Sequence, residues 1–306
     1  MTTNELINKN IQFHLPAFDR IAKAYTRFNL IYLTLGIIEA TLFVVFFSAW
    51  VQSSLLAVSL ALIFLTVFSF FVLRMYLQTQ KAEQFRELQE NFLKSCNFDT
   101  ATPEHHLVQA KACIKFATQL SGREYKYFNL PLLGPIVEKW SYWLHWQDVL
   151  SMRELMFLKA AEEHIKLVKM EPINLEVHVA LANIYVMLTA LYLEFLRADK
   201  KWTFYEQYYS VLEQKHRKMA EKAIEEFKIL SDYAPDDPWV HQQLAYSYHD
   251  LGMPQEEIKE YETILELCPN DYDTLLKLGT LYFQQGHNSK GLKIYDLLQH
   301  RDRQKA

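Results

Sequence analysis

Glycine is scarce in this chain, which has seven glycines among its 306 residues. Loops that cradle phosphate groups need closely spaced glycines, and neither GxGxxG nor GxxxxGK[ST] occurs in the sequence. The common nucleotide-binding motifs are therefore excluded. A basic excess is also lacking, because the formal net charge is -4. General nucleic-acid binding needs a basic surface, so the sequence excludes this class as well.

Cysteine is equally scarce, with Cys96, Cys113 and Cys268 far apart in the sequence. An odd and widely spaced set forms neither a disulfide framework nor a CxxC metal site, so we expect reduced thiols facing a cytosol. The histidines form no HExxH motif, and the adjacent His105 and His106 would diverge by about 100° on a helix. We therefore predict no metal and no cofactor. Because no GxSxG nucleophile occurs either, we predict that the chain is not an enzyme.

Lysine and arginine are absent from residues 28–73, where two long apolar runs follow one another. The runs, Phe28–Val51 and Ser54–Leu73, are joined only by Gln52-Ser53. Each run is about as long as the roughly 20 residues that a helix needs to cross a bilayer. The pattern predicts a transmembrane helical hairpin over residues 28–77.

Cationic residues flank both outer ends of this hairpin. Arg20, Lys23 and Arg27 precede it, and Arg74 and Lys81 follow it. Because positively charged flanks stay in the cytoplasm, we expect two spans with both termini cytoplasmic, in a bacterial inner membrane. No small-residue cleavage site follows the first run, so we expect an uncleaved anchor.

Residues 1–27 are predicted to be a cytoplasmic segment whose last part is amphipathic. Phe18, Ile21 and Tyr25 recur at helical spacing, with cations on the other side. Two arrangements fit this pattern. The segment is either a helix lying on an anionic leaflet or an ordinary cytosolic extension of the first membrane helix.

One carboxylate, Glu39, lies at the centre of the first apolar run. A carboxylate at the bilayer centre is costly unless it is protonated or paired. Folding the hairpin about its short connection brings Glu39 to the depth of Thr66, with Ser59 and Ser69 nearby. We favour a protonated Glu39 bonded to a hydroxyl across the hairpin over a proton-sensing group or an oligomer contact.

A 34-residue spacing recurs near the C-terminus. After a predicted stalk helix and linker at 78–103, apolar residues keep helical spacing and no strand-like alternation occurs, which predicts an all-α fold. One copy contains Leu244-Ala245, Tyr248, Gly252, Tyr261 and Pro269, and the next contains Leu278-Gly279, Tyr282, Gly286 and Tyr295. This pattern resembles the tetratricopeptide repeat (TPR) in its period and motif. The resemblance implies a TPR-like α-solenoid over residues 104–306.

Weaker copies lie upstream and depart from the family pattern. The segment Met187–Ala220 lengthens one copy, and we expect two overlong helices that turn near Asp199-Lys200-Lys201. Another pair would consist of Glu104–Leu120 and a helix ending near Pro172. Position 20 of the last two copies is Glu257 and Gly291 in place of the usual alanine. This departure predicts loosened helix pairs or an irregular terminal unit.

The first helices of such repeats line a concave face that binds a peptide or a helix. The resemblance places ten side chains of mixed polar and aromatic character on this face. They are Asn183, Met187, Trp239, Gln242, Gln243, Tyr246, His249, Lys277, Phe283 and Gln284. We expect them to bind a protein partner.

The connection Ser121–Val149 holds three of the six tryptophans, Trp140, Trp143 and Trp146. Three interpretations are open. The aromatic side chains fill a gap between two helices, lie at the membrane interface, or form a hot spot for a partner.

These patterns predict a membrane-anchored interaction scaffold. They are also compatible with homo-oligomers that form through the hairpin or through the overlong helices. The alternative is a non-catalytic subunit of a membrane transport or secretion complex in which the hairpin and Glu39 carry the role. The hairpin alone also resembles, weakly, the inclusion-membrane proteins of chlamydia-like bacteria. That resemblance would place the chain in a host vacuole membrane after secretion.

Overall fold

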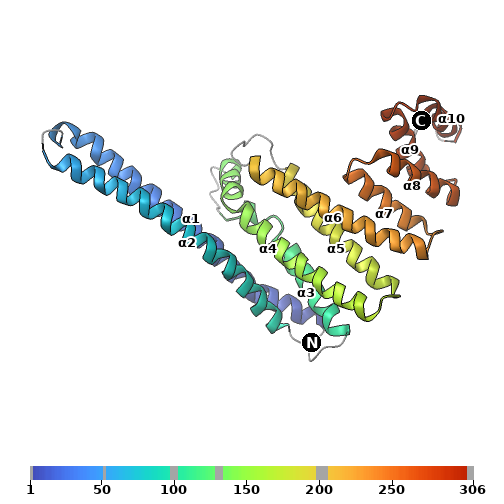
Figure 1. Cartoon of the computed structure of the whole chain (residues 1–306), viewed down its shortest axis with the longest axis horizontal. Coiled ribbons are helices and arrows are strands. Elements are labelled where there is room, and N and C mark those ends of the chain that lie inside the picture. The colour runs from blue at the N-terminus through green and yellow to red at the C-terminus, as the bar shows by residue number, and fades with distance from the viewer. Residues whose placement is uncertain (1–2, 51–52, 97–102, 128–133, 198–205, 302–306) are drawn as a thin grey trace. The chain divides into compact units, whose positions relative to one another are not determined.

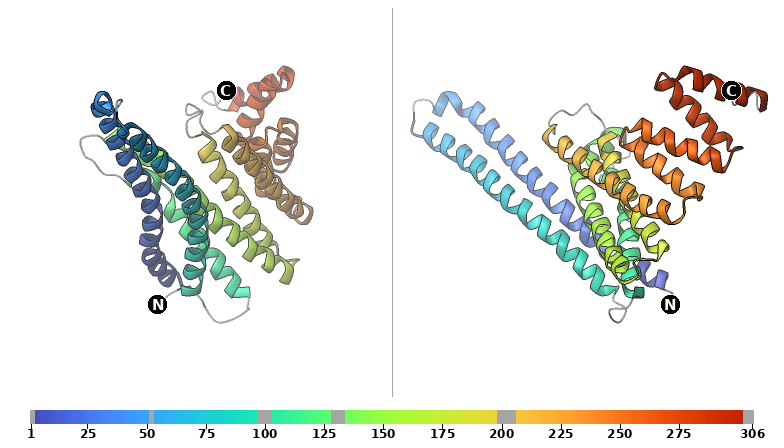
Figure 2. Two further views of the ribbon diagram at one scale, coloured as in Figure 1. Left: turned by 60° about the vertical axis from the view of Figure 1, so that its left-hand side comes forward. Right: turned by 45° about the vertical axis from the view of Figure 1, so that its right-hand side comes forward.

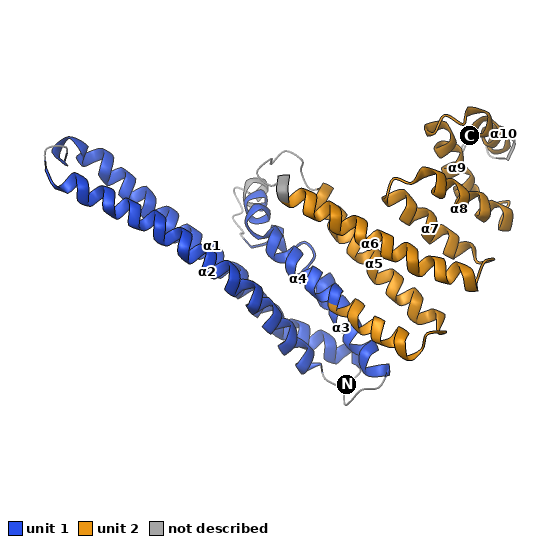
Figure 3. Cartoon of the chain, viewed as in Figure 1, with its two compact units in different colours: residues 1–158 blue, residues 159–306 orange. Residues whose placement is uncertain are grey.

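The computed structural model describes residues 3–50, 53–96, 103–127, 134–197 and 206–301. Every regular element in these ranges is a helix, which confirms the predicted all-α fold. The contacts divide the chain into two units, residues 1–158 and residues 159–306 (Figures 1 and 3).

Unit 1 begins with a hairpin of two long antiparallel helices, α1 (Thr3–Trp50) and α2 (Leu55–Ser95) (Figure 2). At its turn the Ser53 N–H donates to the Trp50 carbonyl at 2.9 Å, while Gln52 lies outside the described residues. Both helices are long and apolar enough to cross a membrane. None of the most apolar 18-residue window of either helix is buried. The hairpin therefore leaves its apolar surface for a bilayer or a partner to cover.

The polar half of the hairpin packs through aromatic contacts. Phe18 is fully buried and stacks on Phe85, with ring centroids 5.6 Å apart. Phe92 packs against Phe116 of α3 (Pro103–Leu120) at 4.8 Å between centroids. Each phenylalanine buried in this way contributes about 1.5–3 kcal/mol. These contacts make α3 part of the base of the hairpin.

Two features of this base bear on the predicted domain division. First, α1 passes residue 27 without a break, so the amphipathic segment continues into the apolar helix, and its Phe18 is covered by α2. Second, the contacts group α3 with the hairpin, whereas the predicted repeat domain began at residue 104. The contact of Phe116 with Phe92 accounts for this grouping, and the predicted domain limits stay a prediction.

Polar contacts fasten the following segment to the same base. In η1 (Arg123–Tyr125), Arg123 Nη1 lies 2.8 Å from Asp19 of α1. An ion pair between Lys81 and the buried Asp148 joins α2 to α4 (Gly134–Met170), and Gln89 Nε2 donates to the Leu155 carbonyl at 2.9 Å. The segment predicted as a connection over residues 121–149 is thus helical from residue 134 onward.

Unit 2 contains three helical hairpins in succession. They are α5 (Leu175–Arg197) with α6 (Glu206–Tyr233), α7 (Pro238–Asp250) with α8 (Pro254–Leu267), and α9 (Tyr272–Gln284) with α10 (Asn288–Arg301). Helix α6 also contacts α7, and α8 contacts α9, so each hairpin packs on the next (Figure 3). This is a TPR-like α-solenoid. The first hairpin is the longest, and its predicted turn near residues 199–201 lies outside the described residues.

The last two hairpins repeat the same hydrogen bonds 34 residues apart. Gly252 and Gly286 have φ values of 65° and 76°, a left-handed conformation that glycine adopts without strain. The next N–H donates back into the first helix in both copies, from Met253 to the Tyr248 carbonyl and from His287 to the Tyr282 carbonyl, at 2.9 and 2.8 Å. The sequence period therefore corresponds to a true structural repeat.

The first helix of each hairpin also has the same N-cap. Asp237 accepts from the Trp239 N–H at 2.9 Å, and Asp271 accepts from the Asp273 N–H at 3.1 Å. Asn174 does the same for Glu176 at 3.1 Å, 63 residues before Asp237. Each cap of this kind contributes about 1 kcal/mol to the helix it begins.

Helix α5 is a third helix that is long and apolar enough to cross a membrane. Its setting is different, because 56% of its most apolar window is buried within the protein. A helix that is apolar on most sides is expected where neighbours cover it, and α5 packs against α6. Its composition is thus explained by the solenoid core.

Close contacts replace the expected looseness at position 20 of the repeat. A Cβ atom on Gly291 would lie 2.9 Å from the ring of Phe283, so the phenylalanine occupies the space of the missing methyl group. In the preceding copy Glu257 is buried and bonds to His249 Nδ1 at 3.2 Å. At Gly291 a side chain of the neighbouring helix therefore occupies the space, and at Glu257 the larger side chain is itself buried, so the structure shows close contacts at this position in both copies.

Gly279 of α9 lies at a second close contact between α9 and α10. A Cβ atom there would lie 3.0 Å from Ile294 Cγ2, and Ile294 is buried and β-branched. We expect Gly279→Leu to destabilise the protein by about 1–3 kcal/mol through overpacking. The measurement is the urea midpoint of the full chain in detergent. Thr280→Leu, one residue along on the exposed side, should shift stability by less than about 0.5 kcal/mol, and equal midpoints for the two variants would contradict the packing argument.

Candidate functional site

The exposed side of α5, α7 and α9 is called the first-helix face here, and it carries the ten predicted partner-binding residues. None of the ten is buried. Seven are exposed, namely Met187, Trp239, Tyr246, His249, Lys277, Phe283 and Gln284, and the other three, Asn183, Gln242 and Gln243, are partly buried. Their accessibility is compatible with binding a partner, which remains a prediction.

Contacts across the repeats order part of this face. Lys277 of α9 donates from Nζ to the Tyr246 hydroxyl of α7 at 2.8 Å, and its ammonium lies 4.7 Å from the Tyr246 ring centroid. These two contacts show that α7 and α9 present their side chains to a common side. Such an ordered Tyr-Lys pair loses little conformational entropy when a ligand binds.

Other members of the face also serve the fold. Trp239 packs edge to face with Phe227 of α6, with centroids 6.0 Å apart. Phe283 covers Gly291, and His249 bonds to the buried Glu257. Substituting these three residues would disturb packing as well as the surface. Tyr246, Met187 and the glutamines are therefore the cleaner residues for testing recognition.

Two histidines, His178 near the start of α5 and His241 near the start of α7, occupy equivalent positions. Neither was among the predicted site residues. His241 bonds through Nδ1 to Glu260 at 2.7 Å and through Nε2 to the Pro235 carbonyl at 2.8 Å. His178 bonds through the same atoms to Glu226 at 2.7 Å and to the Pro172 carbonyl at 3.1 Å. The signal was present as a P-x-x-x-x-V-H motif that occurs at residues 172–178 and 235–241.

At His241 this arrangement requires a proton on both ring nitrogens, because a carboxylate and a carbonyl both accept. Burial alone would lower the pKa of His241. The bonds to Glu260 and Pro235, together with the charge of Glu260, outweigh burial and raise the pKa above its ordinary value of 6.5. The protonated His241 therefore links the start of α7 to α8 and to the preceding turn.

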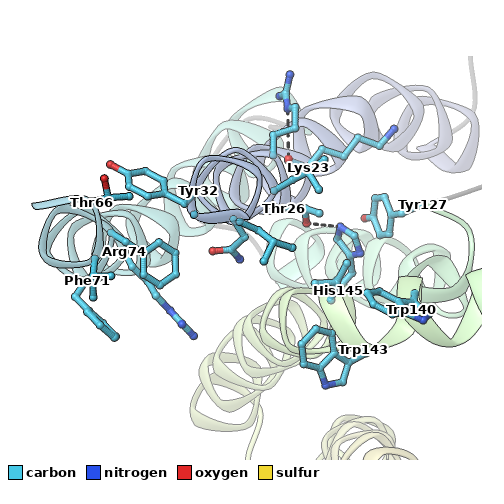
Figure 4. Close-up of a pocket in the computed structure, with 18 of the residues that line it drawn as sticks. Lys23, Thr26, Tyr32, Thr66, Phe71, Arg74, Tyr127, Trp140, Trp143 and His145 are labelled. Atoms are coloured by element: carbon cyan, nitrogen blue, oxygen red, sulfur yellow. Dashed lines mark hydrogen bonds between the residues drawn. The ribbon is translucent and has the colours of Figure 1, made fainter. Parts of the chain in front are cut away.

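Unit 1 contains a second candidate site, a groove of about 1610 Å³ along the hairpin (Figure 4). One wall consists of α1 and α2, with Leu30, Leu33, Val67 and Phe71 among its apolar residues. The opposite wall is formed by Tyr127 and by the first part of α4. Both walls belong to residues 1–158.

Two of the predicted interface tryptophans lie on the α4 wall. Trp140 and Trp143 line the groove and are 62% and 48% exposed, with ring centroids 6.5 Å apart (Figure 4). Trp146 is partly buried and is not among the lining residues. Each step of three residues turns about 60° around the helix, so Trp140 and Trp143 share one side, whereas Trp146 lies about 120° from Trp140.

A buried histidine holds the two walls together. His145 Nδ1 bonds to the Ser141 carbonyl at 3.0 Å, so this nitrogen carries the proton, and Nε2 accepts from the Thr26 hydroxyl of α1 at 2.9 Å. Tyr127 stacks on the same ring, with centroids 4.1 Å apart. Burial lowers the pKa of His145, which keeps the ring neutral as this bonding requires.

Glu39 lies at the deep end of the groove, where it accepts a hydrogen bond. The Thr66 hydroxyl donates to Glu39 Oε1 at 2.7 Å, and Tyr32 donates to Ser69 at 3.3 Å on the same seam. The pairing predicted from depth matching is thus present. Ser59 instead bonds within its own helix, to the Leu56 carbonyl. Within the described ranges, no three His, Cys, Asp or Glu side chains are arranged to hold a metal ion.

Comparisons with known proteins give structural similarities at low sequence identity. Among solved structures, MamA of MSR-1 is 16% identical with a TM-score of 0.34, and it covers 66% of this chain and 98% of its own. TTC0263, a TPR protein of Thermus thermophilus, is 18% identical with a TM-score of 0.33, covering 63% and 92%. YrrB, described as a TPR protein with an unusual peptide-binding site, is 15% identical with a TM-score of 0.26, covering 63% and 87%.

No family model matches the chain, and no curated protein matches it. The weak resemblance of the hairpin to inclusion-membrane proteins receives no support from these comparisons. The assignment of a TPR-like solenoid therefore rests on the repeat geometry within the chain itself.

The bonds of His241 predict a pH dependence of stability. Because its pKa is higher in the folded than in the unfolded state, its contribution is fully present below pH 6.5 and is lost as pH rises through the folded-state pKa. Bonds of this charge-assisted kind contribute about 1.5–3 kcal/mol. We expect His241→Gln and Glu260→Gln to reduce the stability of unit 2 more at pH 5.5 than at pH 8.5. Hydrogen exchange of α7 and α8 amides measures this, with the exposed His287→Gln as the matched control, and a pH-independent loss would contradict the assignment.

Proposed function

We propose that the chain is a membrane-anchored scaffold that binds a protein partner on its first-helix face. The observation that carries this proposal is the side shared by Tyr246 and Lys277, where two successive repeats offer an ordered aromatic and cationic surface. Tyrosine supplies much contact area at little entropic cost and is frequent in binding hot spots. The partner is expected to be an extended peptide or a helix with acidic or hydroxyl groups opposite Lys277.

The hairpin supports the anchoring half of this proposal. Two helices that are long and apolar enough to cross a membrane, with cations at both outer ends, favour two spans with cytoplasmic termini. Tethering would raise the local concentration of a bound partner at the membrane surface. Assembly of other components there would then need no catalysis by this chain.

A second function is favoured by one specific observation. The Thr66–Glu39 hydrogen bond lies within the most apolar part of the hairpin, where polar groups are costly and are often functional. In this alternative the chain is a non-catalytic subunit of a membrane transport or secretion complex. The hairpin would then carry the specific role and unit 2 would only dock.

Tyr246→Ala tests the first-helix face. We expect the variant to lose a soluble partner by at least about tenfold, because truncating a central aromatic residue costs about 2 kcal/mol. The measurement is a quantitative pull-down with the full chain from native membranes. Tyr295→Ala is the matched control, since Tyr295 is similarly exposed, at 41% against 39%, but lies on the second helix α10. Equal recovery with both variants would remove the first-helix face from the mechanism.

Glu39→Leu separates the two functions. The scaffold proposal expects unchanged recovery of the soluble partner and unchanged membrane insertion, because an apolar side chain suits a bilayer. The complex-subunit alternative expects loss of co-purifying integral membrane proteins. Thr41→Leu is the control, since Thr41 is exposed on the hairpin and its hydroxyl donates to the Ile37 carbonyl of its own helix. Loss with Glu39→Leu but not with Thr41→Leu would favour the alternative.

A further inference from the structure

The groove in unit 1 has a cationic mouth. Arg20, Lys23 and Arg27 of α1 and Arg74 of α2 line it, and all four side chains are exposed. Lys23 lies 5.9 Å from the Tyr127 ring centroid and Arg74 lies 5.7 Å from that of Phe70. Across the described ranges of the chain, none of the four has a carboxylate partner within ion-pair distance.

The acidic groups that line the groove are already engaged. Asp19 receives two bonds from Arg123, at 2.8 and 3.0 Å, and one from the Tyr127 hydroxyl at 3.1 Å. Glu39 accepts from Thr66 at the other end. The acidic residues that line the groove therefore do not neutralise the four cations at its mouth. A bound anion would supply the missing negative charge.

Below the mouth the groove is apolar and has the length of one leaflet. On α1 its lining continues from Leu30 to Ala40, a span of ten residue steps, which corresponds to about 15 Å at 1.5 Å per residue. This is half of the roughly 30 Å hydrocarbon core of a bilayer. Gly36 lies midway, and a Cβ atom there would meet nothing within 4 Å, so the groove is open at this depth.

Polar and aromatic groups mark the level between these two parts. Trp140 and Trp143 stand across from the hairpin, and tryptophan prefers the headgroup depth of a membrane (Figure 4). On the hairpin wall, Asn29 Oδ1 is buried and has no hydrogen-bond donor. A buried acceptor without a donor costs about 1–3 kcal/mol, so this site favours a ligand that brings a hydroxyl or ordered water.

We propose that this groove binds one anionic phospholipid of the cytoplasmic leaflet, with its phosphate among Arg27, Arg74 and Lys23 and one acyl chain along the apolar part. The assignment rests on the membrane anchoring proposed above. It goes beyond general attraction to anionic lipid, because it names a single walled site with a headgroup end and a chain end. Its occupant would fix the start of α4 beside the hairpin at the membrane surface.

The test uses the full chain in nanodiscs that contain phosphatidylcholine with an equal or lower fraction of phosphatidylglycerol. Native mass spectrometry after release counts the lipids that stay bound. We expect one phosphatidylglycerol to be retained at least tenfold in preference to phosphatidylcholine. Arg27→Gln/Arg74→Gln should abolish this preference. Arg86→Gln/Lys94→Gln changes the net charge equally, at exposed positions of α2 that do not line the groove, and should leave the preference intact.

A second variant tests the chain end without altering charge. Gly36→Leu places a side chain in the open part of the groove and should reduce retention of phosphatidylglycerol at least fivefold, while helix content and melting temperature stay unchanged. Equal retention of both lipids by the wild-type chain would overturn the proposal. So would an equal loss with the two charge variants, or a dimer in place of a bound lipid. Failure of the chain to enter nanodiscs at all would instead overturn the membrane anchor itself.

Discussion

The rest of unit 1 depends on the packing of the polar half of α1 against α2. Within the described residues, none of the most apolar window of either helix is buried, so the polar halves are the part that can fix the register of the two helices. The stack of Phe18 on Phe85 sets it, and the Thr66–Glu39 bond follows at the corresponding depth within the apolar part. The same base receives α3 through Phe116 and α4 through the Lys81–Asp148 pair. The groove exists because this base holds α4 beside the hairpin.

Unit 2 obtains its order from a different source. Each hairpin is built from local bonds, with an Asp or Asn cap, a left-handed glycine in two of the turns and a histidine clamp in two of the first helices. Between the last two hairpins, Tyr261, Leu275, Tyr282 and Ile294 belong to one buried cluster. Stability in such a solenoid is therefore a sum of local units and neighbour contacts. The side chains of Tyr246 and Met187 are exposed on the first helices and do not belong to this buried cluster. We therefore expect that these two residues can be substituted without loss of the fold.

The parts of the structure that depend on short spacing could be predicted from the sequence. The 34-residue period indicated the paired helices and the turn glycines, and the distance from the hairpin turn indicated the partner of Glu39. The base of unit 1 could not be predicted, because Arg123–Asp19 and Thr26–His145 join residues more than 100 positions apart. The close packing at Gly291 could not be predicted for a related reason. Only the three-dimensional position of Phe283 shows that the missing methyl group is replaced.

The distribution of charge in unit 1 follows from the same packing. Asp19 and Asp148 lie where α3, η1 and α4 meet the hairpin, and each is held by a cation from another segment. The carboxylates of Asp19 and Asp148 are therefore already paired within the base of unit 1. Arg27 and Arg74 lie closer to the apolar half of the hairpin than Asp19 does. Between Arg27 and Glu39, α1 contains no acidic residue. Among the described residues, the fold thus leaves Arg27 and Arg74 without an ion-pair partner at a level where, if the hairpin is anchored as proposed, an anionic membrane surface would supply the opposite charge.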